Sequence, residues 1–383
     1  MKAMESIKKV LTVTASALLC VVLLCALCLP AMAIEQSSVP EKEWSGFEEA
    51  VPDGLKDRLP DGALDDSTSF GESVSKMSSA SYLWQVVSEL LGVELGGAAA
   101  LLATVMAVLT VSAVMSTIGD GAHLSAVKYC TVGALISAVI YTQYTHLERL
   151  VEFFDGLEML MGGMIPVTAG IWAMGGNVST AGVGSATFYV MLSVCHWLCS
   201  STAVPVSGAL TVLGFCDAMS DEVRTGRVMG AIRKIYNFLL NTVMTVLLFS
   251  LSAQSAIAAS ADTAAARAAR LVSGAVIPVV GGSVGETFRT VAGGVAYLKN
   301  SFGIGGILLI ALLTLPLLLS VLLTRCVFLI SGGIADMLGC RNEARLLDNL
   351  AEVYGCLLGV LAGVSVMFVM AICVFMQTAI AVE

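Results

Sequence analysis

Charged residues are scarce in this chain of 383 residues: 13% are Asp, Glu, Lys or Arg, whereas 57% are hydrophobic. One water-soluble core cannot hold so much apolar surface, so the composition predicts an integral membrane protein. A helix of about 20 apolar residues crosses a bilayer. We therefore expect an all-α polytopic membrane protein with about seven spans, together with re-entrant or interfacial segments.

Sequence motifs for catalysis are also missing. The chain has no G-x-x-x-x-G-K-[ST] phosphate loop, so it cannot hydrolyse ATP by that route. Residues 281–285 match the G-x-S-x-G pattern of a serine nucleophile, but the chain has only three histidines, and all precede this serine. Cys195, His196 and Cys199 lack further ligands at the spacing that zinc needs. We expect no enzymatic activity, no cofactor and no bound metal.

Much of the net charge of −9 lies in one segment. Residues 34–80 include eleven acidic and four basic residues, several prolines, many serines and no cysteine. This composition predicts a solvated, loosely ordered arm without disulfide bonds, in which Trp44 and Phe47 mark a short docking element. We expect no nucleic-acid partner, because the charge balance is acidic.

The N-terminus has the features of a secretory signal peptide. Lys2, Lys8 and Lys9 precede an uncharged run over residues 10–29, and an Ala-Met-Ala cleavage site ends at Ala33. The apolar run is long enough to remain as a membrane anchor if cleavage fails. In either case the acidic arm that follows lies outside the cytoplasm.

Two apolar stretches repeat one another about 112 residues apart. Gly162, Pro166 and Gly170 in the first correspond to Gly274, Pro278 and Gly282 in the second, and each proline lies within Ile-Pro-Val. Chance matching of glycine-rich segments is the alternative to a duplication. Duplicated segments interrupted by Gly and Pro are typical of membrane transport proteins, and they are expected to bend against neighbouring helices.

The repeat divides the chain into five predicted parts. These are 1–33, a signal peptide; 34–80, the exported arm; 81–158, two spans and an acidic connector; 159–260, repeat one with an amphipathic helix at 217–237; and 261–383, repeat two with an amphipathic helix at 335–350. The candidates for a structural or channel-assembly role are Gly162, Pro166, Gly170, Gly274, Pro278, Gly282, Glu286 and Arg289.

The membrane topology of the second half is harder to predict. Residues 271–285 are too few for a straight crossing and favour a re-entrant or interfacial segment, in which Glu286 and Arg289 would pair or line an aqueous path. Lys and Arg divide almost evenly among the loops at 217–237, 262–300 and 325–348. The positive-inside rule favours the first and third of these loops as cytoplasmic.

Residues 262–306 resemble the stage III sporulation protein AE family of endospore-forming bacteria. The shared patterns lie at 267–270, 277–281 and 298–303. The resemblance implies a multi-pass protein of the mother-cell membrane that faces the forespore. It also implies a channel, or feeding tube, built with the other stage III sporulation A operon proteins, including a separate ATPase, and indirectly with stage II sporulation protein Q.

A free-standing secondary transporter of a small solute is the alternative function. Its bent repeats would create a binding site near the middle of the bilayer. Such a transporter would show saturable uptake when expressed alone, whereas a channel component would be inert without its partners.

Overall fold

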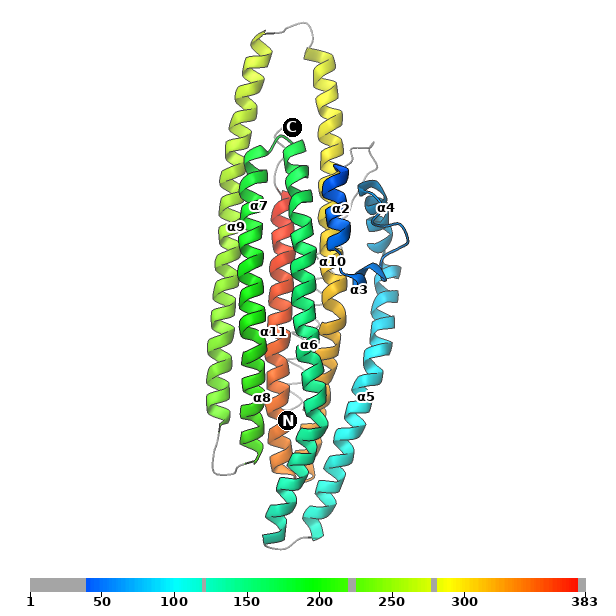
Figure 1. The fold of residues 1–383 in the computed structure, drawn as a ribbon, viewed down its shortest axis with the longest axis vertical. Coiled ribbons are helices and arrows are strands. Elements are labelled where there is room, and N and C mark those ends of the chain that lie inside the picture. Colours follow the sequence, from blue (N-terminus) through cyan, green and yellow to red (C-terminus); the bar gives the residue numbers. More distant parts are fainter. Residues whose placement is uncertain (1–38, 119–121, 220–224, 277–280, 378–383) are drawn as a thin grey trace.

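The computed structural model describes residues 39–118, 122–219, 225–276 and 281–377, and every element within these ranges is helical. The predicted signal peptide lies outside them. Long helices run side by side in an elongated bundle (Figure 1), which confirms the predicted all-α class. They are α5 (Ala80–Ile118), α6 (Ala122–Met174), α7 (Val178–Leu198), α8 (Val204–Met219), α9 (Gly226–Val276), α10 (Gly281–Met337) and α11 (Arg341–Gln377).

Six helical segments of the described chain are long and apolar enough to cross a membrane, one fewer than the number expected. The α6 helix is continuous from the predicted two-span region at 81–158 into repeat one, since it runs through the acidic connector and ends at Met174. Pro166 lies inside α6 without ending it. The α7 and α8 helices are joined by a π-helical turn at Cys199–Ala203, so Ala181–Met219 forms one long candidate span. Segments in which Gly and Pro were expected to cause bends are therefore helical in the described chain.

The predicted amphipathic helices do not form separate surface elements. The first is divided, because α8 ends at Met219 and α9 begins at Gly226. Asp217 favours the start of α9 at Gly226. Its carboxylate accepts hydrogen bonds from the Gly226 amide (2.9 Å) and the Thr225 hydroxyl (3.3 Å) at the N-terminus of this helix. The second is divided by the turn around Gly339, whose φ of +79° favours glycine.

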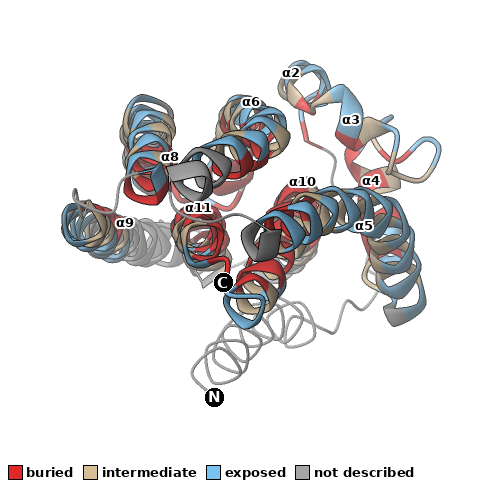
Figure 2. Cartoon of the chain, turned by 90° about the horizontal axis from the view of Figure 1, so that it is seen from below, coloured by how far each residue is buried: buried red, intermediate tan, exposed pale blue. Residues whose placement is uncertain are grey.

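The core of the bundle is centred on α11. Figure 2 shows α11 surrounded by the other long helices, with α5 and α9 at the periphery. In α10 and in α11, 61% of the most apolar stretch is buried, against 22% in α5 and in α9. The hairpin of α10 and α11 is therefore the part on which the other helices pack.

The acidic arm is folded, contrary to the expectation of loose order. It forms α2 (Glu41–Ala50), α3 (Asp53–Lys56) and α4 (Ser67–Met77), which lie beside α6 and α10 (Figure 1). The composition was misleading because the few apolar residues of the arm all meet one surface of the bundle.

Candidate functional site: the arm docked on the bundle

An aromatic cluster fastens the arm to the bundle. Trp44 and Phe47 of α2, Phe70 of α4 and Phe302 of α10 are all buried. Their ring centroids are 5.2 to 6.4 Å apart, mostly in edge or tilted arrangements. Such pairs contribute about 0.5–1.5 kcal/mol each beyond the burial of their area. We call these four residues the aromatic box. Trp44 and Phe47 thus dock the arm on α10.

Hydrogen bonds close the loops that connect the arm helices. The Trp44 indole Nε1 donates to the Leu64 carbonyl at 2.7 Å, and the Tyr82 hydroxyl donates to the Arg58 carbonyl at 2.6 Å. These bonds tie the segment between α3 and α4 both to α2 and to the beginning of α5. A buried indole N–H and a partly buried backbone carbonyl are thereby satisfied.

A proline in α10 supplies a further docking contact. Pro316 has no N–H, so it cannot make the helical hydrogen bond to the carbonyl of Leu312, four residues earlier. Arg58 of the arm donates to that carbonyl through Nη1 at 3.3 Å. A break in the backbone hydrogen bonding of α10 is thus satisfied by a side chain of the acidic arm.

Three glycines at seven-residue intervals let α2 approach α6 closely. An added Cβ at Gly163 would collide with Ala50 and contact Phe47, and one at Gly170 would collide with the Glu43 carboxylate. At Gly156 it would meet Pro52 and Leu313. A period of seven places all three glycines on one face of α6. From Gly156 to Gly170 the arm residues that they meet run from Pro52 back to Glu43, so α2 is antiparallel to α6.

Asp66 begins α4. Its Oδ1 accepts a hydrogen bond from the Ser69 amide at 2.6 Å and another from the Thr68 hydroxyl at 2.6 Å. These bonds, above all the one from the Ser69 backbone, hold the pKa of Asp66 below its usual value. The N-cap therefore orders the helix that carries Phe70 into the aromatic box.

The structure places some of the residues predicted from the repeat. Gly170 contacts the arm, Pro166 lies inside α6 four residues earlier, and a Cβ at Gly162 would meet nothing within 4 Å. Gly163, its neighbour, makes the contact instead. Reading the seven-residue period of glycines would have identified Gly163, whereas the aromatic partners Phe70 and Phe302 have no comparable signal.

The second copy of the repeat is described only in part. Gly274 lies in the last turn of α9, and Gly282, Glu286 and Arg289 lie in the first turns of α10, where the side chains fall outside the described parts. Pro278 lies outside the described residues altogether. The re-entrant segment, the pairing of Glu286 with Arg289 and the duplication therefore remain predictions.

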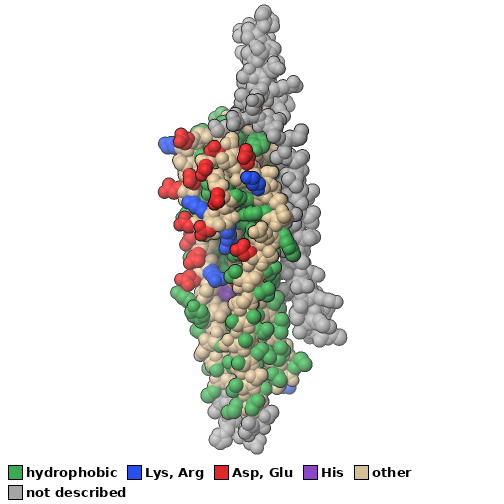
Figure 3. Space-filling view, turned by 90° about the vertical axis from the view of Figure 1, so that its right-hand side faces the viewer, with side chains coloured by type: hydrophobic (Ala, Val, Ile, Leu, Met, Phe, Trp, Pro, Cys, Tyr) green, Lys and Arg blue, Asp and Glu red, His purple; other side chains and the backbone are tan. Residues whose placement is uncertain are grey.

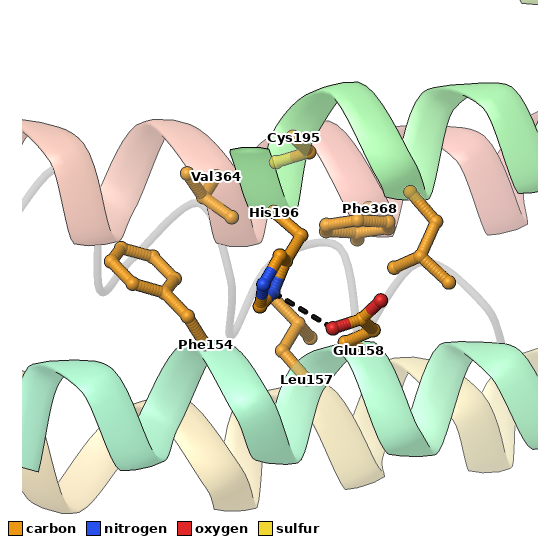
Figure 4. Close-up of a pocket in the computed structure, with 8 residues that line it drawn as sticks. Phe154, Leu157, Glu158, Cys195, His196, Val364 and Phe368 are labelled. Atoms are coloured by element: carbon orange, nitrogen blue, oxygen red, sulfur yellow. Dashed lines mark ion pairs between the residues drawn. The ribbon is translucent and has the colours of Figure 1, made fainter. Parts of the chain in front are cut away.

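A small pocket between α6, α7 and α11 holds an ion pair. Figure 4 shows His196 pointing toward Glu158, with Phe154, Val364 and Phe368 around them. His196 Nδ1 and Glu158 Oε2 are 2.8 Å apart, although the angle is not that of a hydrogen bond. No group of three or more His, Cys, Asp or Glu residues that could hold a metal ion occurs in the described part of the chain. The pair links α6 to α7.

Comparisons with known proteins found a family and a relative. The family model of stage III sporulation protein AE matches residues 68–379. The stage III sporulation protein AE of Bacillus subtilis (strain 168) is 23% identical over 241 residues, covering 63% of this chain and 60% of that protein. The match thus spans less than two thirds of the length of that relative. No solved structure matches. Since the family model matches most of the chain, the chain belongs to the stage III sporulation protein AE family.

Proposed function

We propose that the protein is a non-enzymatic, multi-pass membrane component of the transenvelope channel, or feeding-tube complex, between mother cell and forespore. Its site is the mother-cell membrane that faces the forespore. Its partners are the other stage III sporulation A operon proteins, including a separate ATPase, and indirectly stage II sporulation protein Q. Family membership supports a role in sporulation, and the missing phosphate loop fits a complex in which another subunit hydrolyses ATP.

The docked arm is the observation that carries this proposal. Figure 3 shows acidic side chains gathered along one side of the upper half of the molecule and hydrophobic side chains spread over the lower half of that face. The helix ends near Arg227 and Arg341 lie at the opposite end of the bundle (Figure 1). The positive-inside rule puts these basic ends in the cytoplasm and the acidic arm outside. A rigid, charged surface above the membrane is what an assembly platform requires.

Affinity purification from sporulating cells tests this function. The tagged protein, solubilised in a mild detergent, is expected to bring the other stage III sporulation A proteins with it. A variant with a disturbed arm, Gly163→Leu, is expected to lose the partners that have exported domains and to keep the cytoplasmic ones. The matched control is Gly162→Leu, because a side chain at Gly162 meets no neighbour.

Recovery of the protein without partners would contradict this proposal. Purified protein in liposomes would then be tested for saturable uptake of small solutes. Such uptake by the protein alone would establish the alternative, a secondary transporter.

A further inference from the structure

Polar side chains from three helices meet around His146 in the middle of the bundle. His146 is buried on α6. Its Nε2 lies 3.1 Å from the Ser320 hydroxyl of α10, and its Nδ1 lies 3.0 Å from the Tyr354 hydroxyl of α11. Ionisable side chains at membrane depth are energetically costly and commonly mark ion or proton pathways. Neither the docked arm nor the proposed function uses this cluster.

The backbone assigns the tautomer of His146. Nδ1 lies 2.8 Å from the carbonyl oxygen of Thr142, which can only accept a hydrogen bond, so Nδ1 carries the proton. Nε2 is therefore an acceptor, and the Ser320 hydroxyl donates to it. The imidazole is thus held ready to take up a second proton at Nε2 from the side of Ser320.

Ser320 connects His146 to the surface of the bundle. Arg149 Nη1 is 3.4 Å from the Ser320 oxygen and 3.5 Å from Glu94 Oε1. Arg149 is half exposed, so this ion pair lies at the side of the bundle. The charged or titratable groups that face His146 are Glu94 from α5, Arg149 from α6 and Tyr354 from α11, whereas α10 contributes the hydroxyls of Ser320 and Thr324.

Two buried side chains in the bundle lack hydrogen-bond partners among the described residues, Gln143 beside His146 and Ser331 about 16 Å from Ser320 along α10. Gln143, one turn from His146 on the same face of α6, is 4% exposed, and neither atom of its amide is hydrogen-bonded. Ser331 on α10 is fully buried, and its hydroxyl has no hydrogen-bond partner among the described residues. Unpaired buried polar groups cost about 1–3 kcal/mol each, and bound water is the usual remedy. Both positions therefore favour water inside the bundle.

A buried carboxylate lies near the other end. Glu343, in the first turn of α11, is 2% exposed, and its Oε1 accepts hydrogen bonds from Ser112 (2.6 Å) and Thr131 (2.7 Å). Along α6, Thr131 and Gln143 are separated by about 18 Å at the rise of an α-helix. The buried residues Leu135 and Val139 lie between them. Apolar layers of this kind close water-filled paths in membrane proteins.

We propose that the membrane bundle contains a proton-transfer path, with His146 as the central carrier. A proton from water at the Glu94–Arg149 pair binds the Ser320 oxygen as the Ser320 hydroxyl proton moves to Nε2, and His146 becomes an imidazolium ion. When water enters the layer of Leu135 and Val139, the Nδ1 proton leaves through water held by Gln143 to the Glu343 carboxylate. Its departure leaves a neutral imidazole with its proton on Nε2. Transfer of that proton to Nδ1 through the water chain restores the Nδ1–H tautomer, and release of the proton from the Glu343 carboxyl group to water beyond it completes one transfer.

Nuclear magnetic resonance of His146 tests the carrier directly. The full chain with His123→Gln and His196→Gln retains one histidine, which is labelled with ¹⁵N and studied in lipid bilayers between pH 4 and pH 9. We expect the Nδ1–H tautomer at high pH, imidazolium at low pH, and proton exchange with water at least tenfold slower in Ser320→Ala. Ser137→Ala, an exposed serine of α6, is the matched control. A neutral ring at every pH, or exchange that Ser320→Ala leaves unchanged, would overturn the proposal.

Proton flux tests the path. Liposomes that contain the Val139→Ser variant, a potassium gradient and valinomycin are expected to acidify at least tenfold faster than liposomes with the unmodified protein. The double variant Val139→Ser with His146→Gln should lose that increase. A flux that persists without His146 would show that protons bypass it, and no flux from a folded Val139→Ser variant would argue against the path.

Discussion

The arm and α5 are consecutive segments that cover the same helix, α10, in opposite ways. The arm buries its apolar side chains, such as Phe47, Phe70 and Met77, and exposes its acids except Glu43, which lies against α6. The α5 helix exposes apolar side chains, such as Val93, Val111 and Val114, and only 22% of its most apolar stretch is buried. The difference shows which solvent each segment meets: the arm is built for water, whereas α5 is built for lipid.

The change between the two patterns is abrupt. The arm ends at α4, and Trp84, in the first turns of α5, is largely exposed. Tryptophan is enriched at the interface between membrane and water. The exposed Trp84 is therefore consistent with an interface between membrane and water at the junction of the arm and α5. The following predictions test whether docking of the arm depends on contacts from which water is excluded.

The largest effect is expected from the aromatic box. Phe47→Ala removes a fully buried ring and should destabilise arm docking by about 3–5 kcal/mol. The destabilisation should appear as faster hydrogen exchange of the arm amides, because the arm opens locally more often. Val111→Ala, at an exposed position on α5, is the lipid-facing comparison and should leave the arm unchanged. Equal effects of the two substitutions would contradict the contrast between arm and α5.

The glycine contacts should give the next largest effect. Gly163→Leu forces a side chain into Ala50 and should weaken arm docking by about 1–3 kcal/mol, whereas Gly162→Leu should have little effect. Limited proteolysis of the protein in lipid nanodiscs measures the difference as faster cleavage between α3 and α4. If both variants are cleaved at the same rate, α2 does not pack on that face of α6.

The bond from Arg58 to α10 should contribute less. Arg58→Ala leaves the Leu312 carbonyl without its charged donor and should cost about 1.5 kcal/mol in arm docking. Lys56→Ala is the matched control, since its exposed ion pair with Asp53 is worth little. Pro316→Ala restores an N–H to α10 and should also loosen the arm. Hydrogen exchange of α3 compares the three variants, and an effect of Lys56→Ala as large as that of Arg58→Ala would count against the contact.

The smallest effect should come from the cap of α4. Asp66→Ala should cost about 1 kcal/mol of arm stability. The folded-state pKa of Asp66 is depressed, so its contribution is present above the unfolded-state pKa of about 4 and is lost as the pH falls through the folded-state value. Hydrogen exchange of α4 should show the difference between wild type and variant at pH 6, and that difference should shrink in acid. A difference that does not depend on pH would exclude the carboxylate as its source.

Local patterns predicted the membrane class, the family and the docking role of Trp44 and Phe47. Each of these depends on composition or on residues close together in the sequence. The fold of the arm could not be predicted in this way, because Trp44 and Phe70 fold only against Phe302, which belongs to a distant helix. Gly and Pro were poor indicators of helix ends, since packing keeps α6 continuous through Pro166.

The aromatic box also orders events during synthesis. Phe302 follows Phe70 by 232 residues in the chain, and at about 5–20 residues per second a ribosome adds that length in roughly 10–50 s. Throughout this interval the aromatic box lacks Phe302, although α6 already offers α2 its glycine face, and the aromatic rings are open to chaperones and proteases. The aromatic box can therefore close only after α10 has been made and inserted. A closed box thus indicates that biogenesis of the chain has passed this stage.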